Sequence, residues 1–248
     1  MKKIILIVAL TILALHSKAI EPLPQSLKEQ MIQSGIYKEG CPVALNNLRL
    51  VTVAYKDFKG ELQEGKIVVS SDIANEVVQI FNMLVKLDYP IQKVAPLSNY
   101  GSYINAINKN ITYGFDCRVD LNNPKKWSKH AFGKAIDINP VQNPYVNGSK
   151  ILPANSKRYT GLGRRHIGIV ADNRAILLKT DAPIDVFKKK NWKWGGDFAG
   201  YKDYAHFEKE VDEQSALPIT QQKKEQNINN IKVKNLFKNM PTEDNGLF

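Results

Sequence analysis

The feature that most constrains this chain is a pair of short segments in which histidine, aspartate and glycine occur at characteristic spacings. Residues 128–140 read Ser-Lys-His-Ala-Phe-Gly-Lys-Ala-Ile-Asp-Ile-Asn-Pro, and residues 203–207 read Asp-Tyr-Ala-His-Phe. A fold that joins the two segments would bring His130, Asp137 and His206 around one ion. Catalytic zinc usually has three such protein ligands and keeps its fourth position for water. The chain is therefore predicted to bind Zn²⁺ and to be a hydrolase.

These motifs resemble those of the zinc D-alanyl-D-alanine carboxypeptidases and L-alanyl-D-glutamate endopeptidases, which cut the peptide stems of bacterial cell walls. The resemblance runs from about Gly40 to Glu208. In that family, Ser-x-His-x-x-Gly-x-Ala-x-Asp carries two metal ligands, and Asp-x-x-His or Glu-x-x-His carries the general base and the third ligand. The resemblance therefore implies the same three ligands, His130, Asp137 and His206, with Asp203 as the base.

The resemblance also implies a catalytic arginine upstream of the first ligand. The family commonly keeps a Cys-Arg pair before a Trp-Ser-x-His segment, and here Cys117-Arg118 precedes Trp127-Ser128. Arg118 is therefore the expected partner of the oxyanion that forms at the scissile carbonyl. Judged by residue type alone, Arg118 would be a surface ion-pair residue, and only its position favours the catalytic interpretation.

Three further residues are candidates for supporting roles. Trp194, in the segment 192–198, is expected in the core or in the pocket wall rather than in a platform for sugars. Asp197 is a candidate hydrogen-bond partner for a ligating histidine, and the alternative is an ordinary turn carboxylate. Ser128 either contacts substrate or shapes the turn before His130, and the sequence favours neither interpretation.

The resemblance implies an α+β fold of the hedgehog and D-Ala-D-Ala peptidase type, in which helices flank a small antiparallel sheet that carries the zinc site. Hydrophobic periodicity adds local detail, because apolar residues recur at helical spacing in some segments and β-branched residues gather in others. Residues 140–164 are rich in proline, glycine and asparagine and are expected to form a long loop beside the site. Strands are predicted over 48–55, 91–97, 113–119 and 134–138, and helices over 26–33, 74–85 and 184–190.

The N-terminus has the pattern of a secretory signal peptide over residues 1–19. Lys2 and Lys3 precede an apolar run over 4–15, and small residues follow where a signal peptidase would cut. The run is shorter than the roughly 20 apolar residues that span a bilayer, so an uncleaved anchor is the less favoured interpretation. We therefore expect export to the periplasm, the cell wall or the medium, and no transmembrane helix in the mature chain.

The rest of the chain is expected to be one zinc peptidase domain over residues 20–216 and a polar, disordered tail over 217–248. We expect a monomer. The net charge of +11 suits anionic polymers in general, including nucleic acid, membrane surfaces and the cell wall. Because no recognition helix or RNA-binding signature is present, no specific nucleic-acid partner is expected. The expected partner is the peptidoglycan stem peptide.

Cys41 and Cys117 are the only cysteines in the sequence. In an exported protein, two cysteines are expected to form a disulfide. Closing so long a loop would stabilise the fold by about 4 to 5 kcal/mol, and it would tie the backbone beside Arg118 to the N-terminal segment. The alternative is two buried thiols. Thiolate ligation of metal is less favoured, because no Cys-x-x-Cys spacing occurs.

A zinc-binding module without catalysis is the alternative function, since related folds include signalling domains that keep the metal. The presence of both Asp203 and Arg118 favours an enzyme. An aspartate as the base resembles the endolysin-like L-alanyl-D-glutamate endopeptidases, whereas the carboxypeptidase and dipeptidase branches use glutamate. The choice between a carboxypeptidase and an endopeptidase stays open at this point.

Overall fold

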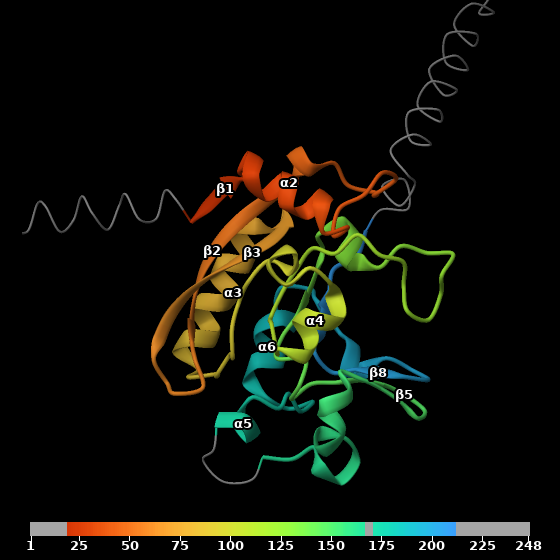
Figure 1. Ribbon diagram of the computed structural model, residues 1–248. Helices are drawn as coiled ribbons and strands as arrows, with labels where there is room; N and C mark the ends of the chain where they lie inside the picture. Colours follow the sequence, from red (N-terminus) through yellow and green to blue (C-terminus); the bar gives the residue numbers. More distant parts are fainter. Residues whose placement is uncertain (1–18, 167–170, 212–248) are drawn as a thin grey trace, which may run out of the picture.

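The computed structural model describes residues 19–166 and 171–211. It is an α+β fold built from three small antiparallel sheets and a few helices (Figure 1). This confirms the predicted fold class. Most of the expected signal peptide and all of the expected polar tail lie outside the described residues, so both stay predictions.

The N-terminal sheet has the strand order β1-β2-β3 and consists of β1 (Ile20–Pro22), β2 (Leu48–Lys56) and β3 (Leu62–Ser70). The second strand was predicted from its β-branched residues. The third was not, because its first residues are polar or exposed and only its second half is continuously buried. A turn at Asp57, whose carboxylate accepts hydrogen bonds from the backbone of Lys59 and Glu61, joins the two long strands.

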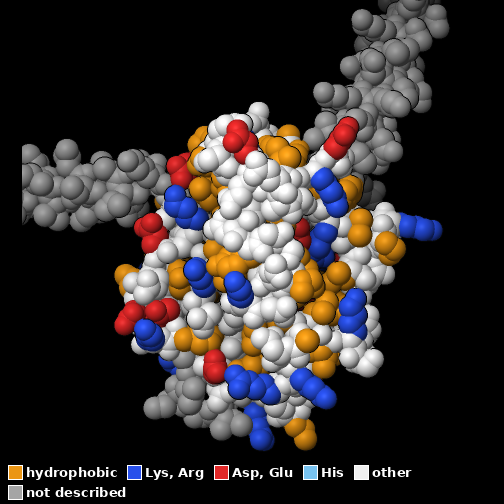
Figure 2. Space-filling model, in the orientation of Figure 1, with side chains coloured by type: hydrophobic (Ala, Val, Ile, Leu, Met, Phe, Trp, Pro, Cys, Tyr) orange, Lys and Arg blue, Asp and Glu red, His pale blue; other side chains and the backbone are white. Residues whose placement is uncertain are grey.

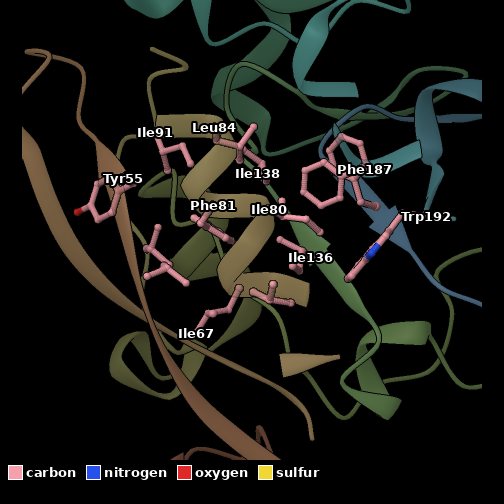
Figure 3. Packing of buried hydrophobic residues seen from close by; sticks show 14 of the residues in the cluster. Tyr55, Ile67, Ile80, Phe81, Leu84, Ile91, Ile136, Ile138, Phe187 and Trp192 are labelled. Atoms are coloured by element: carbon pink, nitrogen blue, oxygen red, sulfur yellow. The ribbon is translucent and has the colours of Figure 1, made fainter. Parts of the chain in front are cut away.

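The main core lies between this sheet and the rest of the fold. Helix α3 (Ala74–Lys86) buries residues at helical spacing, in agreement with the predicted amphipathic pattern. Figure 3 shows Ile80 and Phe81 of α3 between Tyr55 on the N-terminal sheet and Ile136 on a second sheet. The helix therefore connects the long hairpin to the strands that carry the candidate site.

A second core cluster surrounds the disulfide between Cys41 and Cys117, which confirms the predicted pairing. Helix α2 (Gln25–Gln33) contributes Leu27 and Met31 to this cluster, and helix α4 (Tyr103–Asn108) contributes Ala106 and Ile107.

The two remaining sheets are built from strands of two or three residues. One has the order β4-β9-β7 and the other has the order β6-β5-β8. Their strands are β4 (Ala135–Asp137), β5 (Tyr145–Asn147), β6 (Lys150–Leu152), β7 (Lys193–Trp194), β8 (Lys202–Asp203) and β9 (His206–Glu208). The other elements are α5 (Ala171–Arg174), α6 (Ala182–Lys188) and 3-10 turns at Leu45–Asn47, Leu97–Tyr100, Lys129–Phe132, Ala154–Tyr159, Gly161–Gly163 and Gly195–Asp197.

Two predicted strands are wrong in detail. Residues 91–97 and 113–119 make only isolated bridges, such as Val94 with Thr112 and Tyr113 with Asp137. Both segments are rich in buried residues because they run through the interior, and burial alone produced the strand-like pattern. The predicted loop over 140–164 instead contains the β5–β6 hairpin and two 3-10 turns.

The surface carries charges of both signs. Figure 2 shows lysine and arginine side chains over much of the visible face, interspersed with acidic and apolar groups. Among the described residues, no helix has both the length and the apolar character needed to cross a bilayer.

Candidate metal centre

The three predicted ligands are brought together by one strand pair and one turn. His130 lies in the 3-10 turn Lys129–Phe132, Asp137 ends β4, and His206 begins β9. The antiparallel register places Asp137 directly opposite His206, so both side chains lie on the same face of the sheet. Gly133 reverses the chain between His130 and β4 with a φ of 68°, and an added Cβ would lie 2.6 Å from the Ser70 nitrogen.

The candidate ligand atoms form a nearly equilateral triangle. The Nε2 atom of His130 lies 3.1 Å from both the Asp137 Oδ1 and the His206 Nδ1, and these last two atoms are 2.9 Å apart. Ligand atoms about 2.0–2.1 Å from a tetrahedral zinc are separated by roughly 3.3 Å, which is close to these distances. All three side chains are buried.

The hydrogen bonds behind the histidines determine which nitrogens face the centre. The Nδ1 atom of His130 lies 2.6 Å from the Gly114 carbonyl, and the Nε2 atom of His206 lies 3.0 Å from a Glu208 oxygen. Since a carbonyl and a carboxylate only accept, we assign the protons to these outer nitrogens. Two imidazole lone pairs and a carboxylate oxygen therefore converge, an arrangement that fits a cation.

Tyr113 holds the remaining oxygen of the aspartate ligand. Its hydroxyl donates a hydrogen bond to Asp137 Oδ2, and its ring stacks on His130 with the centroids 5.0 Å apart. Oδ1 is thereby left for the metal. Tyr113 was not predicted from the sequence, because it reaches Asp137 only through an isolated bridge between distant segments.

The electrostatics favour positive charge at the centre. Burial raises the pKa of Asp137, but His130 and His206 lower it well below its ordinary value. Burial lowers the pKa of His206, but hydrogen bonds to Asp137 and Glu208 raise it to about 10. The two carboxylates thus create a negative potential between the ligands.

A cavity of about 290 Å³ opens beside the centre and is lined by Arg118, Ser128, Asp203, His206 and Glu208, among others. The sequence motifs therefore converge on one pocket.

Asp203 lies in this cavity at the end of β8. Burial and the nearby Asp137 raise its pKa to about 7, although His206 and Arg118 oppose the shift. A tight turn between β8 and β9 joins Asp203 to His206. Gly195 packs under this turn, because an added Cβ would lie 3.0 Å from the Asp203 Cβ and 3.1 Å from the His206 Cβ.

Arg118 reaches the cavity from the segment after the disulfide, and its side chain is 18% exposed. Burial lowers the pKa of Arg118, but Tyr113, Tyr103 and Asp116 raise it above the ordinary value, so the guanidinium keeps its charge.

The three residues expected in supporting roles, Ser128, Trp194 and Asp197, differ in what they contact. Ser128 is buried, lines the cavity, and accepts a hydrogen bond from the His130 nitrogen at 3.3 Å, which supports the turn-shaping interpretation. Trp194 is buried in the core, and its indole nitrogen donates to the Tyr204 carbonyl at 2.9 Å, inside the turn that follows Asp203. It therefore braces this turn from the core.

Asp197 does not contact a ligating histidine. Its carboxylate accepts a hydrogen bond from Lys188 at 2.8 Å and lies 3.7 Å from the Lys179 nitrogen. The carboxylate partner of His206 is Glu208 instead. A sequence signal for Glu208 did exist, because residues two apart on a strand share a face.

Comparison with known proteins agrees with this geometry. Residues 122–209, about a third of the chain, match a family model described as D-alanyl-D-alanine carboxypeptidase. The match includes all three candidate ligands and Asp203, whereas Arg118 lies upstream of it. No curated protein and no solved structure matches the chain. The matched segment supports the resemblance seen in the motifs, over residues 122–209.

Proposed function

We propose that this protein is an exported zinc metallopeptidase that hydrolyses peptide bonds in the stem peptides of peptidoglycan. The observation that carries the proposal is the grouping of His130, Asp137 and His206 beside a cavity that His206 lines together with Asp203 and Arg118. The peptidase family match supports the reaction class. The disulfide supports export, because such bonds persist mainly in oxidising compartments.

The donor set fits zinc, since two imidazoles and one carboxylate leave a fourth position open. When bound, Zn²⁺ lowers the pKa of a coordinated water to about 7 and polarises the scissile carbonyl. Asp203 accepts the proton of the attacking water and passes it to the leaving amine. Its position in the cavity that His206 also lines supports this role.

Arg118 donates hydrogen bonds to the oxygen that becomes negatively charged when the carbonyl is attacked. Removing one such donor typically costs about 10² to 10³ in turnover. Glu208 and Tyr113 orient the His206 and Asp137 ligands through the contacts described above.

The bond that is cut is proposed to be either the terminal D-Ala-D-Ala bond or the L-Ala-D-Glu bond. The aspartate base favours the second through its resemblance to the endolysin-like enzymes. Both bonds belong to the same substrate, so one assay distinguishes them.

The test uses purified muropeptides, followed by mass spectrometry, with the protein as isolated, after chelation and after zinc is restored. Cleavage should disappear with chelation and return with zinc. Release of a single alanine identifies a carboxypeptidase, and a cut before the D-glutamate identifies an endopeptidase.

Asp203→Asn should keep zinc and lose about 10² to 10⁴ in turnover. Asp197→Asn is the matched control, since its carboxylate lies in a surface ion pair. Stoichiometric zinc without any cleavage would show a binding module instead of an enzyme.

A further inference from the structure

Arg118 is held by two side chains that the sequence motifs do not include. We propose that Asp116 is a positioning residue that fixes the guanidinium of Arg118 toward the cavity, with Tyr103 supporting the guanidinium from one face. The inference rests on the proposed function, because Arg118 acts there on the scissile carbonyl.

Asp116 is the ionic partner of Arg118. Its Oδ2 atom lies 3.1 Å from the Arg118 Nε, and its side chain is only 6% exposed. Neither atom makes a hydrogen bond in the part of the chain that the structure describes, so the contact between them is an ion pair. The attraction between the two charges therefore offsets the cost of removing them from water. Removing one of them leaves the other buried and unpaired.

Tyr103 supports the guanidinium through its ring. The Cζ atom of Arg118 lies 4.8 Å from the ring centroid, a cation–π distance. The same ring contacts Tyr113 edge-on, with the centroids 6.1 Å apart. Tyr103 therefore contacts both the arginine and the tyrosine that holds the aspartate ligand.

These contacts leave one edge of the guanidinium free. Nε faces Asp116, and Nη1 makes a long hydrogen bond of 3.4 Å to the Val119 carbonyl. Nη2 makes no hydrogen bond to any described residue, although Arg118 lines the cavity. Because a guanidinium is a rigid planar fork, fixing its Nε edge and its face also fixes where Nη2 points.

The backbone around the pair is already anchored to the metal centre. The Asp116 nitrogen donates to the His130 carbonyl at 3.2 Å, and the Ser128 nitrogen donates to the Arg118 carbonyl at 3.1 Å. The remaining freedom of Arg118 lies in its long side chain. Asp116 and Tyr103 restrict that freedom.

A double-mutant cycle tests whether Asp116 acts through Arg118. Asp116→Asn keeps the size of the side chain and removes its charge, and it should lower kcat by roughly 10- to 100-fold, as expected for a misplaced catalytic group. In an Arg118→Ala background the same change should have almost no further effect on kcat, because nothing remains to be positioned. Zinc content is measured in every variant. An equal fold-loss of kcat in both backgrounds would overturn the proposal.

A second readout does not depend on activity. The Nε–H signal of Arg118 in a ¹⁵N NMR spectrum is identified by its loss in Arg118→Ala. Its hydrogen exchange should be slow in the parent protein and markedly faster in Asp116→Asn. If the parent protein cleaves no muropeptide, the proposed function fails and this exchange rate alone decides the inference; unchanged exchange would refute it.

Variants of Tyr103 provide a separate test, which remains valid if Asp116→Asn does not fold. Tyr103→Leu removes the ring and should lower kcat more than KM is raised, whereas Tyr103→Phe keeps the ring and should rescue turnover. Tyr100→Leu is the matched control, because Tyr100 packs on the same core cluster but has Lys109 over its ring. Equal losses of turnover in Tyr103→Leu and Tyr100→Leu would show that the ring has only a structural role.

Discussion

Removing the charge of Glu208 while keeping its shape should weaken zinc binding by a predictable amount. Glu208 accepts a hydrogen bond from the His206 Nε2 at 3.0 Å, and its side chain is 17% exposed. Hydrogen bonds to charged groups contribute about 1.5–3 kcal/mol and neutral ones about 0.5–1.5 kcal/mol. Glu208→Gln keeps an acceptor for this hydrogen and loses the charge, so it should lose about 1–1.5 kcal/mol. That is roughly a tenfold increase in the Kd for zinc.

Glu208→Ala removes the acceptor as well and should approach the hundredfold loss that is typical of partners behind a ligating histidine. The assay is competition with a chromophoric chelator near neutral pH. Glu210→Gln is the matched control, because Glu210 lies two residues further on, is exposed, and pairs with Lys193. If Glu208→Gln, Glu208→Ala and Glu210→Gln all bound zinc equally well, the assigned tautomer of His206 would lose its support.

Three further outcomes are expected. His206→Ala should abolish stoichiometric zinc in metal analysis, whereas His166→Ala should retain it; retention of zinc in both would refute the ligand assignment. Replacing Cys41 and Cys117 together by serine should lower the free energy of unfolding by up to about 4–5 kcal/mol in denaturant titrations, and unchanged stability would contradict the chain-entropy argument. Partial burial raises the pKa of Asp72, but the ion pair with Lys134 outweighs this effect and holds the pKa below its ordinary value. Its stabilisation is thus present above the ordinary carboxyl pKa and is lost as the pH falls through the lower folded-state pKa. Asp72→Asn should therefore lower Tm slightly near neutral pH and not in strong acid. An equal decrease of Tm at both pH values would contradict the assigned direction of the pKa shift.

The grouping of His130, Asp137 and His206 was predictable, because their spacing in sequence indicates a turn and a strand. His130 and Asp137 are separated by the turn at Gly133, and His206 follows Asp203 across the two-residue turn of Tyr204 and Ala205. Such local patterns can be recognised in the sequence without any knowledge of the tertiary fold. The disulfide was predictable for a simpler reason, since only one pairing exists.

The surroundings of the ligands were less predictable, because they depend on contacts between distant segments. Tyr113 reaches Asp137 across 24 residues, and nothing in its neighbourhood marks it as different from a core tyrosine. Asp197 was the candidate partner of a ligating histidine, but its carboxylate accepts a hydrogen bond from Lys188 on α6 instead. Which carboxylate a lysine neutralises is a tertiary property.

The strand errors have a similar cause. Residues 113–117 are all buried, which produces the same apolar pattern as a strand, but neighbouring chain segments pair with the segment 113–119 only at single positions. Pairing partners, and not local preference, decide whether an extended segment becomes part of a sheet.

The register that pairs Asp137 with His206 has a consequence for folding. The two strands that carry these ligands are three residues long, too short for their own ladder to hold them firmly. A shift of one residue would turn one ligand to the opposite face and destroy the triangle. An ion bound by both strands therefore selects a single alignment, and its binding free energy adds to that of the folded state, by about 4 kcal/mol at a free concentration 1,000 times the Kd. Zinc would in this way cross-link the two strands and hold them in one register. The amide of Ile138, which donates a hydrogen bond to the Ala205 carbonyl beside the pair, should then exchange its hydrogen more slowly as zinc is added.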